Sequence, residues 1–370
     1  MKKASILQSA VFLLFIAAFF ILHLILPDNS FSERENRVLQ PLPRFSWSAL
    51  QSGRFTSMLE SYCSDQFPLR DGWITLKAGS ELALGKEENN GVCLCAGDTL
   101  IEPWTAPSSD TPEARMAAVN ALAENSGLPV TFALIPDASE LWREKLPFGV
   151  PNDSQADYVR AAYALSAVPT ADVLGALEAH RDEPIFYRTD HHWTTLGAYY
   201  GYTAVAKALG LSPVPLSDYR ETVVTREFYG TAYSSSGFSW VQPDSISAYV
   251  PDDGLTVTNY PAGQPEPGTL YEESRLAVKD KYAYFYGGNT PRIEIETGRD
   301  GQKLLILRDS YTDSLSPFLL AHYSRITMLD LRYYKLGLRD FLAEHDFDQI
   351  LICYGVKSFA EDAQVPAMAE

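Results

Sequence analysis

The segment RTDHHWTTLGAYY carries the residues of this chain that are best suited to acid–base chemistry. Asp190, His191, His192 and Trp193 lie between a short apolar segment and the start of an expected helix. In an extended chain, side chains two residues apart point the same way. Asp190 and His192 are therefore expected to enter one cleft while His191 points away. A carboxylate that holds one imidazole nitrogen leaves the other free as a base.

A matching nucleophile lies in the later segment LLILRDSYTDSLSPFLL. A buried strand is expected to end near Asp309, with Ser310 next and a helix soon after. Ligands bind at the carboxyl ends of strands in open α/β sheets, and a helix N-terminus favours developing negative charge. Backbone N–H groups at Ser310 and Tyr311 can form part of an oxyanion hole.

Taken alone, the histidine segment and the serine segment each have a commoner explanation. The serine is then an ordinary helix N-cap, and the Asp-x-His pair is structural or binds a metal. Their joint occurrence in one alternating α/β chain favours a Ser-His-Asp triad made of Asp190, His192 and Ser310.

Metal binding is the alternative use of Asp190, His191 and His192. Adjacent histidines in an extended chain diverge, and the other histidines show no ligand spacing. We therefore expect no metal and no other cofactor. We expect His191 and Trp193 to support the loop by packing or hydrogen bonding, and Trp193 is also a candidate for oxyanion or substrate binding. The cysteines are expected to be buried thiols, although a disulfide is permitted outside the cytoplasm; they are Cys63, Cys93, Cys95 and Cys353.

A sheet of parallel strands would bring these segments together. From about residue 110, expected helices alternate with short buried strands, which is typical of a parallel sheet flanked by helices. Thr194 can cap the helix after the histidine motif, and Gly210 can end it. Strands are expected at 130–135, 185–188, 303–308, 326–331 and 349–354, and helices at 111–126, 155–166, 173–180 and 194–209.

The N-terminus begins with an apolar run at residues 10–26, AVFLLFIAAFFILHLIL, preceded by Lys2 and Lys3. The run is close to the roughly 20 residues that a spanning helix needs, and the lysines should stay in the cytoplasm. No small-x-small cleavage pattern or lipobox cysteine follows, so an uncleaved anchor is favoured over a cleaved signal peptide. We expect a single-pass protein of the cell membrane, with residues 28–370 outside the cytoplasm.

Three parts of the chain follow from these patterns. Residues 1–27 are the anchor or signal, 28–109 form a linker with helical and hairpin segments, and 110–370 form the α/β domain. Within the last part, residues 213–300 are rich in proline, glycine and tyrosine with little helical periodicity, which predicts a β-rich insertion. Such an insertion either determines substrate selectivity or covers a sheet edge.

The middle part contains two local signals. Apolar residues recur at helical spacing over residues 55–84, with Pro68 as an interruption. The segment VCLCAGDTLI, residues 92–101, predicts a hairpin with its turn at Gly97 and Asp98.

The composition and net charge limit the classes of partner that this chain can bind. The 370 residues are 46% hydrophobic and 12% aromatic, enough for a sizeable core. The formal net charge of -17 argues against nucleic acid as a partner, because the field of the protein would repel a polyanion.

At TDHHWT the chain resembles the DHHW family and, through it, the SGNH-hydrolase-like domain of alginate O-acetyltransferases (AlgX/AlgJ-like). The resemblance implies an SGNH-like, flavodoxin-like fold whose Asp-x-His-Trp block and later serine correspond to Asp190, His192 and Ser310. It also implies acetyl transfer to, or removal from, envelope or exported polysaccharide, with an acyl donor or a multispanning acyl-transfer partner. Other similar segments are SERENR, QFPLRD, NNGV, DKYAYFYGGN, RDSYTDSLSPFL and ITMLDLRYY.

Two features depart from ordinary SGNH hydrolases. Those enzymes place the serine first, whereas here the order is permuted, as it is in the alginate-related proteins. The glycine and asparagine of the usual oxyanion hole correspond most closely to Gly288 and Asn289, for which a tight turn is the alternative role.

The expected function is that of an extracytoplasmic serine-dependent O-acyltransferase or esterase acting on acetyl groups of polysaccharide. The tyrosine-rich insertion offers stacking surfaces for sugars. The alternative is a non-catalytic envelope assembly or glycan-binding protein that retains the fold.

Overall fold

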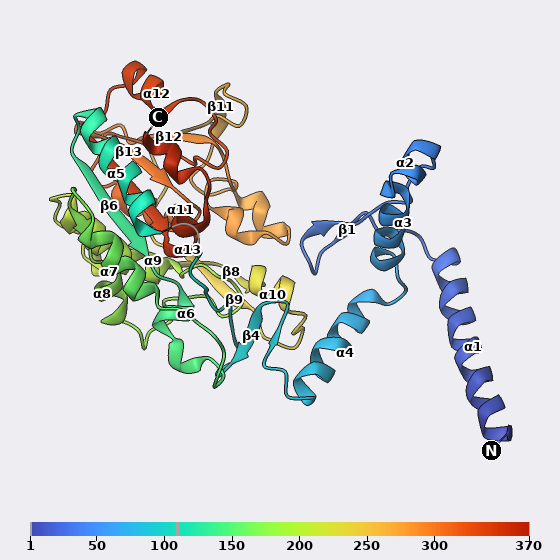
Figure 1. The fold of residues 1–370 in the computed structure, drawn as a ribbon. Helices are drawn as coiled ribbons and strands as arrows, with labels where there is room; N and C mark the ends of the chain where they lie inside the picture. Colours follow the sequence, from blue (N-terminus) through green and yellow to red (C-terminus); the bar gives the residue numbers. More distant parts are fainter. Residues whose placement is uncertain (1, 109–110, 370) are drawn as a thin grey trace. The chain divides into compact units, whose positions relative to one another are not determined.

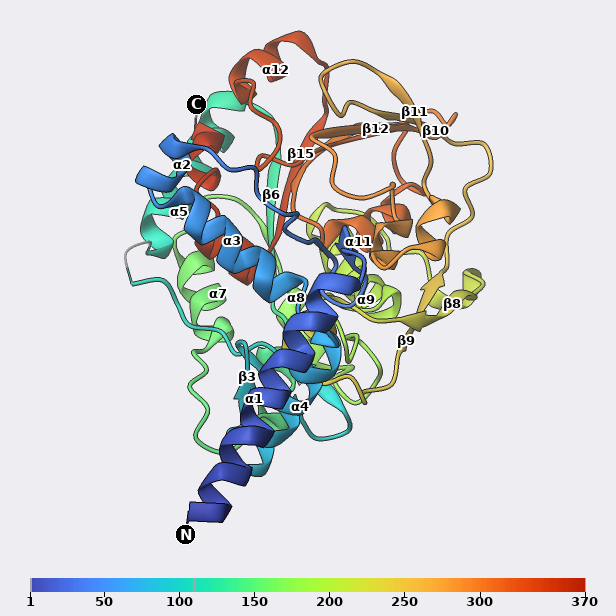
Figure 2. The same ribbon diagram turned by 90° about the vertical axis from the view of Figure 1, so that its right-hand side faces the viewer.

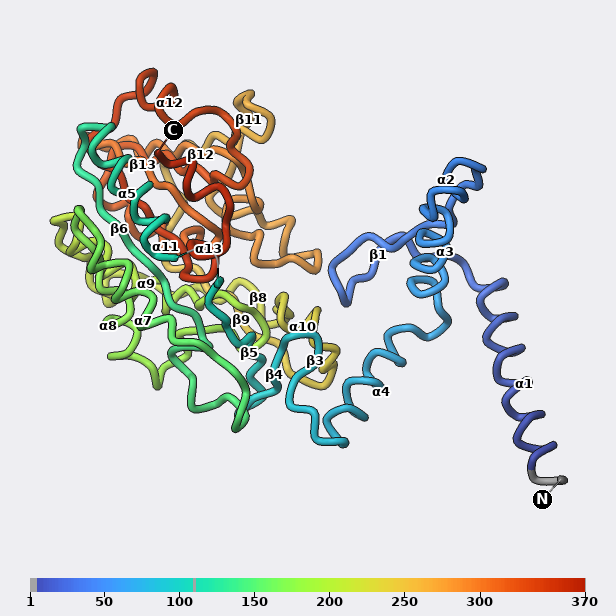
Figure 3. The backbone as a smooth tube through the Cα atoms, in the orientation of Figure 1, coloured from blue at the N-terminus to red at the C-terminus, as the bar shows by residue number. Residues whose placement is uncertain are grey.

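The structure, a computed structural model, describes residues 2–108 and 111–369. The backbone divides into two compact units, which Figure 3 traces. The first unit is Met1–Asn89 with Gly237–Ser239, and the second is Asn90–Ser236 with Trp240–Glu370. The division at residues 27 and 109 stays a prediction, and its boundary at residues 109 and 110 lies outside the described residues.

The first unit is mainly helical. Its long helix contains an apolar segment, Ser5–Ile25, that is long enough to cross a membrane and fits a single-pass anchor or a signal segment. The expected interruption at Pro68 is confirmed, because one helix ends at Asp65 and the next begins at Arg70. The elements are α1 (Lys2–Ile25), β1 (Phe31–Ser32), β2 (Arg37–Val38), α2 (Trp47–Gln51), α3 (Arg54–Asp65), α4 (Arg70–Ala83) and β3 (Glu88–Asn89).

The second unit is built on a large, mostly parallel sheet with the strand order β11-β10-β12-β14-β13-β15-β6-β7 (Figure 1). Strands β14, β13, β15, β6 and β7 run parallel, and β12, β10 and β11 extend one edge with antiparallel pairs (Figure 2). The strands are β6 (Val130–Ile135), β7 (Thr170–Ala171), β10 (Thr256–Asn259), β11 (Glu266–Gly268), β12 (Arg292–Glu296), β13 (Lys303–Arg308), β14 (Arg325–Leu329) and β15 (Gln349–Gly355).

Helices cover both faces of this sheet. Alternate residues of β13 enter two different cores, since successive side chains on a strand point to opposite faces. Leu304 and Ile306 pack with α9 and α11, whereas Leu305 and Leu307 pack with α5, α7, α12 and α13. The helices are α5 (Pro112–Ser126), α6 (Ala138–Leu141), α7 (Gln155–Ala164), α8 (Val173–Glu178), α9 (Thr195–Ala208), α10 (Thr231–Ser236), α11 (Thr312–Leu319), α12 (Leu338–Glu344) and α13 (Val356–Glu361).

Smaller elements complete the second unit. The predicted hairpin is confirmed: β4 (Val92–Cys95) pairs with β5 (Thr99–Ile101), and Gly97 and Asp98 adopt the positive φ angles that such a turn requires. Strands β8 (Thr222–Phe228) and β9 (Asp244–Ala248) form a separate antiparallel pair. The 3₁₀ helices are η1 (Arg143–Lys145), η2 (Leu216–Asp218), η3 (Glu273–Ala277), η4 (Lys281–Tyr284) and η5 (Val365–Ala369).

The fold class predicted from the sequence is confirmed as mixed α/β with a large, mostly parallel sheet. The β-rich insertion contains β8 to β12 but also α10 and short 3₁₀ helices, and its strands β10 to β12 cover the edge at β14. Cys93, Cys95 and Cys353 are buried thiols, as expected. Cys63 is exposed instead, because α3 buries none of its residues.

One predicted strand is wrong. Residues 185–188 contain buried apolar side chains, yet they do not join the sheet. Phe186 forms an isolated bridge with Trp193, and the N–H of Thr194 donates to the carbonyl of Ile185 at 2.9 Å. Part of the backbone of this segment bonds within its own loop, and Arg188 bonds elsewhere: its carbonyl accepts the N–H of Leu100 at 2.7 Å and its N–H donates to Asp244 Oδ2 at 3.0 Å.

Candidate active site

Ser310 lies at the carboxyl end of β13, directly before α11, as the sequence predicts. The Asp309 side chain, which is fully buried, fixes the loop around it. Its Oδ1 accepts the N–H of Tyr311 at 3.0 Å, and its Oδ2 accepts the N–H of Gly355 at 2.8 Å. The half-buried Ser310 is therefore held on a rigid edge of the sheet.

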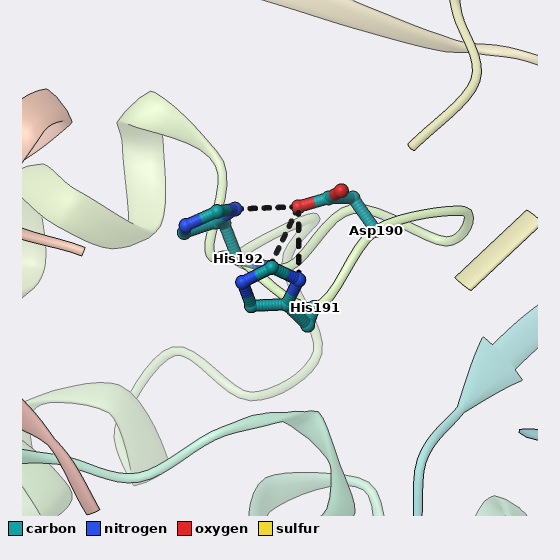
Figure 4. A group of neighbouring side chains, drawn as sticks. All are labelled: Asp190, His191 and His192. Atoms are coloured by element: carbon teal, nitrogen blue, oxygen red, sulfur yellow. Dashed lines mark hydrogen bonds and ion pairs between the residues drawn. The ribbon is translucent and has the colours of Figure 1, made fainter. Parts of the chain in front are cut away.

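The histidine loop has a different shape from the one expected. Residues 188–192 bend, and Asp190 Oδ1 accepts the backbone N–H of His192 at 3.0 Å. The carboxylate and the imidazole meet through this short-range turn, not through alternation along an extended strand. His191 does not point away: its ring centroid lies 3.9 Å from that of His192, and both imidazoles face Asp190 (Figure 4).

The side chains of Asp190, His192 and Ser310 are joined by two consecutive hydrogen bonds. His192 Nδ1 lies 2.6 Å from Asp190 Oδ1, and His192 Nε2 lies 2.9 Å from Ser310 Oγ. An ionised carboxylate can only accept, so Nδ1 carries the proton and Nε2 accepts the serine hydroxyl. Asp190 and His192 are 3% and 5% exposed, which shields the hydrogen bond between them from water, while the half-buried Ser310 stays accessible.

The electrostatics suit a general base. Burial, reinforced by the charge of His191 and opposed by Asp190, lowers the pKa of His192 to about 4. Burial alone would raise the pKa of Asp190, but His191, His192 and the N–H of Thr231 bring it well below its ordinary value. At neutral pH the pair is a carboxylate beside a neutral imidazole, which is the state that can accept a proton.

Trp193 and Tyr311 join the histidine loop to the serine loop. The fully buried Trp193 indole donates from Nε1 to the Tyr311 carbonyl and to Ser314 Oγ, both at 3.0 Å. The Tyr311 hydroxyl donates to the carbonyl of His191. The N–H of Tyr311, predicted as an oxyanion donor, is already donated to Asp309.

Gly288 and Asn289, the other predicted oxyanion residues, form no hydrogen bond with Asp190, His192 or Ser310 among the described residues. The N–H of Gly288 donates to the carbonyl of Phe285 at 3.3 Å in a turn that gives Gly288 a φ of 107°. Asn289 is exposed, with its amide 3.5 Å from the Tyr333 hydroxyl. These contacts are those of a turn; the oxyanion role stays a prediction.

A metal ion would compete with hydrogen bonds already in place. Ligand atoms of Asp190, His191 and His192 lie within 4.8 Å of one another, closer than diverging histidines would allow. His191 Nδ1, however, lies 2.7 Å from the Thr231 hydroxyl, and His192 Nδ1 is bonded to Asp190. The observed arrangement is that of a hydrogen-bonded base.

Sequence reasoning did not identify Thr231. Its N–H and its hydroxyl donate to Asp190 Oδ2 at 2.8 and 3.1 Å, so it holds the carboxylate oxygen that His192 does not use. Thr231 begins α10 in the insertion, far from the histidine motif in sequence. No local pattern points to it.

Gly230, beside Thr231, offers a test of how strictly Asp190 must be placed. A Cβ atom at Gly230 would lie 2.2 Å from Asp190 Cβ and 2.3 Å from its Oδ2. Gly230→Ala must therefore displace the carboxylate, and we expect it to lower kcat/KM with an activated acetyl ester by about 100-fold. Gly72→Ala is the control, because a Cβ there meets nothing within 4 Å. Equal activities of the two variants would contradict the expectation.

Two cavities lie beside the histidine loop. One of about 370 Å³ is lined by Asp190, His191, Tyr311 and Lys357 among others. The second, of about 840 Å³, has both aromatic and carboxylate side chains in its lining, including Trp142, Tyr249 and Glu221. Both have room for a small-molecule group or a sugar.

Comparison with known proteins gives this fold and site a context. The family model described as DHHW protein matches residues 158–329. The protein described as "Probable alginate O-acetylase AlgJ" from Pseudomonas syringae pv. tomato is 26% identical over 259 residues, 65% of this chain and 66% of that protein. The AlgJ of Pseudomonas aeruginosa is 28% identical over 186 residues, 46% of each. The chain thus spans about half to two thirds of the length of the curated relatives it matches.

Solved structures agree. A DHHW family protein from Eubacterium siraeum superimposes with a TM-score of 0.66 and 25% identity, covering 76% of this chain and 95% of that one. Bacillus cereus PatB1, solved with a sulfonyl adduct, has a TM-score of 0.61 and 21% identity over 71% and 94% of the two chains. The resemblance to the DHHW family is confirmed: the chain is homologous to the AlgJ alginate O-acetylases and shares the fold of these structures.

Proposed function

We propose that this homologue of alginate O-acetylases is a membrane-anchored, SGNH-type O-acetyltransferase that acts on an extracytoplasmic polysaccharide through Asp190, His192 and Ser310. The main observation in support of the proposal is the chain of hydrogen bonds that runs from the Asp190 carboxylate through the His192 imidazole to Ser310 Oγ. The names of the AlgJ relatives support an acetyl group as cargo and a polysaccharide as acceptor.

The reaction proceeds in two halves. His192 Nε2 takes the proton of Ser310 Oγ as that oxygen attacks the acetyl carbonyl of a donor. The bond from the acetyl carbon to the donor breaks, and the donor leaves with the proton from His192. A sugar hydroxyl then gives its proton to His192 and attacks the acetyl-serine ester, which releases the acetylated sugar and restores Ser310. Water in place of the sugar makes the same site an esterase.

The N–H of Tyr311 already donates to Asp309. Unless that bond breaks, the oxyanion requires other hydrogen-bond donors. Arg332 is a further cationic group at this edge of the sheet. It follows β14, the strand beside β13, and its Nε and Nη2 donate to the buried Asp330 at 2.9 and 2.6 Å. Its charge acts on His192 and favours a negative oxygen nearby.

Covalent trapping tests the proposal. The full chain in detergent is exposed to an activated acetyl ester and, separately, to a fluorophosphonate, and the modified residue is found by mass spectrometry. We expect one acetyl or phosphonyl adduct on Ser310, none in Ser310→Ala, and normal labelling in Ser316→Ala. Ser316 is the matched control, because it is a buried serine of α11 that bonds Tyr286 instead of the triad.

Equal labelling of the Ser310→Ala variant would overturn the proposal. The rival function is a non-catalytic assembly or glycan-binding protein. It would be supported if cells carrying Ser310→Ala kept normal polysaccharide acetylation.

The pH dependence of acylation follows from the lowered pKa of His192. The neutral imidazole is the active base, and a lower pKa preserves it to lower pH. With a pKa of about 4, kcat/KM should stay level from pH 7 to near pH 5 and halve close to pH 4. An unperturbed histidine would halve it near pH 6.5. Circular dichroism at each pH excludes unfolding as the cause, and a midpoint near 6.5 would contradict the expectation.

A further inference from the structure

Two other aromatic rings pack closely against the imidazole of His192. The Tyr282 ring stacks on it with a centroid distance of 3.8 Å and an interplanar angle of 9°. The His191 ring lies on His192 at 3.9 Å and 36°. Tyr282 is 7% exposed and belongs to η4, far along the chain from the histidine motif. Tyr282 lies outside both the histidine segment and the serine segment. Its stacking therefore restricts the orientation of the His192 ring.

The hydroxyl of Tyr282 reaches the other half of the site. It donates to the carbonyl of Ser310 at 3.1 Å and lies 3.2 Å from Ser314 Oγ. Ser314 Oγ also accepts the Trp193 Nε1–H, so the tyrosine and the tryptophan meet at one serine of α11. Burial raises the pKa of Tyr282 well above its ordinary value, so this hydroxyl remains a proton donor throughout the working pH range.

We propose that Tyr282 is the positioning residue of the triad: its ring holds the His192 imidazole and its hydroxyl holds the Ser310 backbone. The inference rests on the proposed function and adds to it. Asp190 holds only one edge of the imidazole, and rotation about that hydrogen bond would move Nε2 away from Ser310 Oγ. Stacking opposes this rotation. The π face of the tyrosine also lies against the ring that becomes cationic when it takes the serine proton.

Two substitutions separate the ring from the hydroxyl. Tyr282→Phe keeps the stack and removes the donor, and we expect it to lower kcat by less than about 10-fold. Tyr282→Leu removes the stack, and we expect it to lower kcat by about 100-fold while KM changes little, because misplacement of reacting groups acts on the chemical step.

Tyr284→Leu is the matched control. Tyr284 belongs to the same η4 helix, is 6% exposed and stacks on Tyr271 at 4.9 Å and 10°, away from the triad. Its loss reproduces the cost of deleting a buried, stacked tyrosine, so Tyr284→Leu should lower thermal stability about as much as Tyr282→Leu yet keep kcat. Equal loss of kcat in the two leucine variants, or unchanged kcat in Tyr282→Leu, would overturn the proposal.

Proton NMR of the His192 ring gives a readout that does not depend on turnover. A ring stacked face to face on an aromatic ring has its carbon-bound protons shifted upfield. We expect the full upfield shift in the wild type and in Tyr282→Phe, and a clearly smaller one in Tyr282→Leu, where the His191 ring still lies against His192. Wild-type activity in Ser310→Ala would refute the proposed function whatever the NMR result. Loss of activity in Ser310→Ala alone, with full activity in Tyr282→Leu, would refute only the role of Tyr282.

Discussion

Replacement of His192 by alanine is expected to lower kcat for acetyl transfer by about four orders of magnitude, because in the proposed mechanism this ring links the Asp190 carboxylate to the Ser310 nucleophile. His192 Nε2 is the acceptor at 2.9 Å from Ser310 Oγ, and without it the hydroxyl stays protonated at neutral pH. Single-turnover acetylation of the protein measures the first half-reaction directly.

His345→Ala serves as the control for a histidine substitution. His345 follows α12, where its Nδ1 lies 2.9 Å from the carbonyl of Phe341, and it has no part in the triad. The His345 variant should acetylate at the wild-type rate. Combining His192→Ala with Ser310→Ala should cost little more than either alone, because the residues act as one unit. Full additivity of the two losses would count against a shared mechanism.

Substitution of Arg308 by methionine is expected to lower the free energy of unfolding by about 3–5 kcal/mol at pH 8, because breaking a buried ion pair leaves its partner uncompensated. The Arg308 side chain is fully buried and its Nη1 lies 2.5 Å from Asp313 Oδ1. Asp309 and Asp330 are also fully buried close to this pair, and both influence the charge of Asp313. Denaturant unfolding monitored by tryptophan fluorescence measures the loss.

The penalty of Arg308→Met should shrink as the pH falls. Burial raises the pKa of Asp313 to about 7, opposed by Arg308, so this carboxyl is largely protonated in the folded protein below that pH. Its folded pKa lies above its unfolded value, which means that stability is lost as the pH rises through 7. At pH 5 the methionine variant therefore leaves less negative charge unpaired than at pH 8. A penalty that is equal at both pH values would contradict this account.

Arg160→Met is the matched control for Arg308→Met. Arg160 pairs with Asp157, but the two side chains are 67% and 72% exposed. Solvent screens such a pair, so its loss should change the unfolding free energy by less than about 0.5 kcal/mol.

Several elements could be predicted because their cause is local. The strands at 130–135 and 303–308 coincide with β6 and β13, since a buried parallel strand is a continuous apolar run that ends at polar residues. Thr194 caps α9 through its side chain, as predicted from its position before a helical stretch. The apolar segment 185–188 has the same local composition as a strand. Its hydrogen-bond partners, however, lie in its own loop and at Leu100 and Asp244, not in a strand of the large sheet, and composition does not reveal them.

The residues of the site also fall into those that the sequence predicted and those that it did not. Asp190, His192 and Ser310 were predicted from residue type and from the rule that parallel strands end at one edge, and the structure brings their side chains within hydrogen-bonding distance. The reason given for the Asp190–His192 pairing was wrong, because the backbone there bends. Thr231 and Tyr282 were missed, since each lies in the insertion, far from the histidine motif in sequence, and meets the site only through the tertiary structure.

The amino-acid sequence by itself therefore determined the α/β class, the apolar N-terminal helix and the three side chains available for acid–base chemistry, because periodicity, capping and residue type act over a few neighbours. Only the tertiary structure decided that Nε2 faces Ser310, that Asp190 is held by Thr231, and that Tyr282 covers the imidazole. Those contacts join segments distant in the chain, and their geometry follows from strand order and core packing, which no single segment encodes.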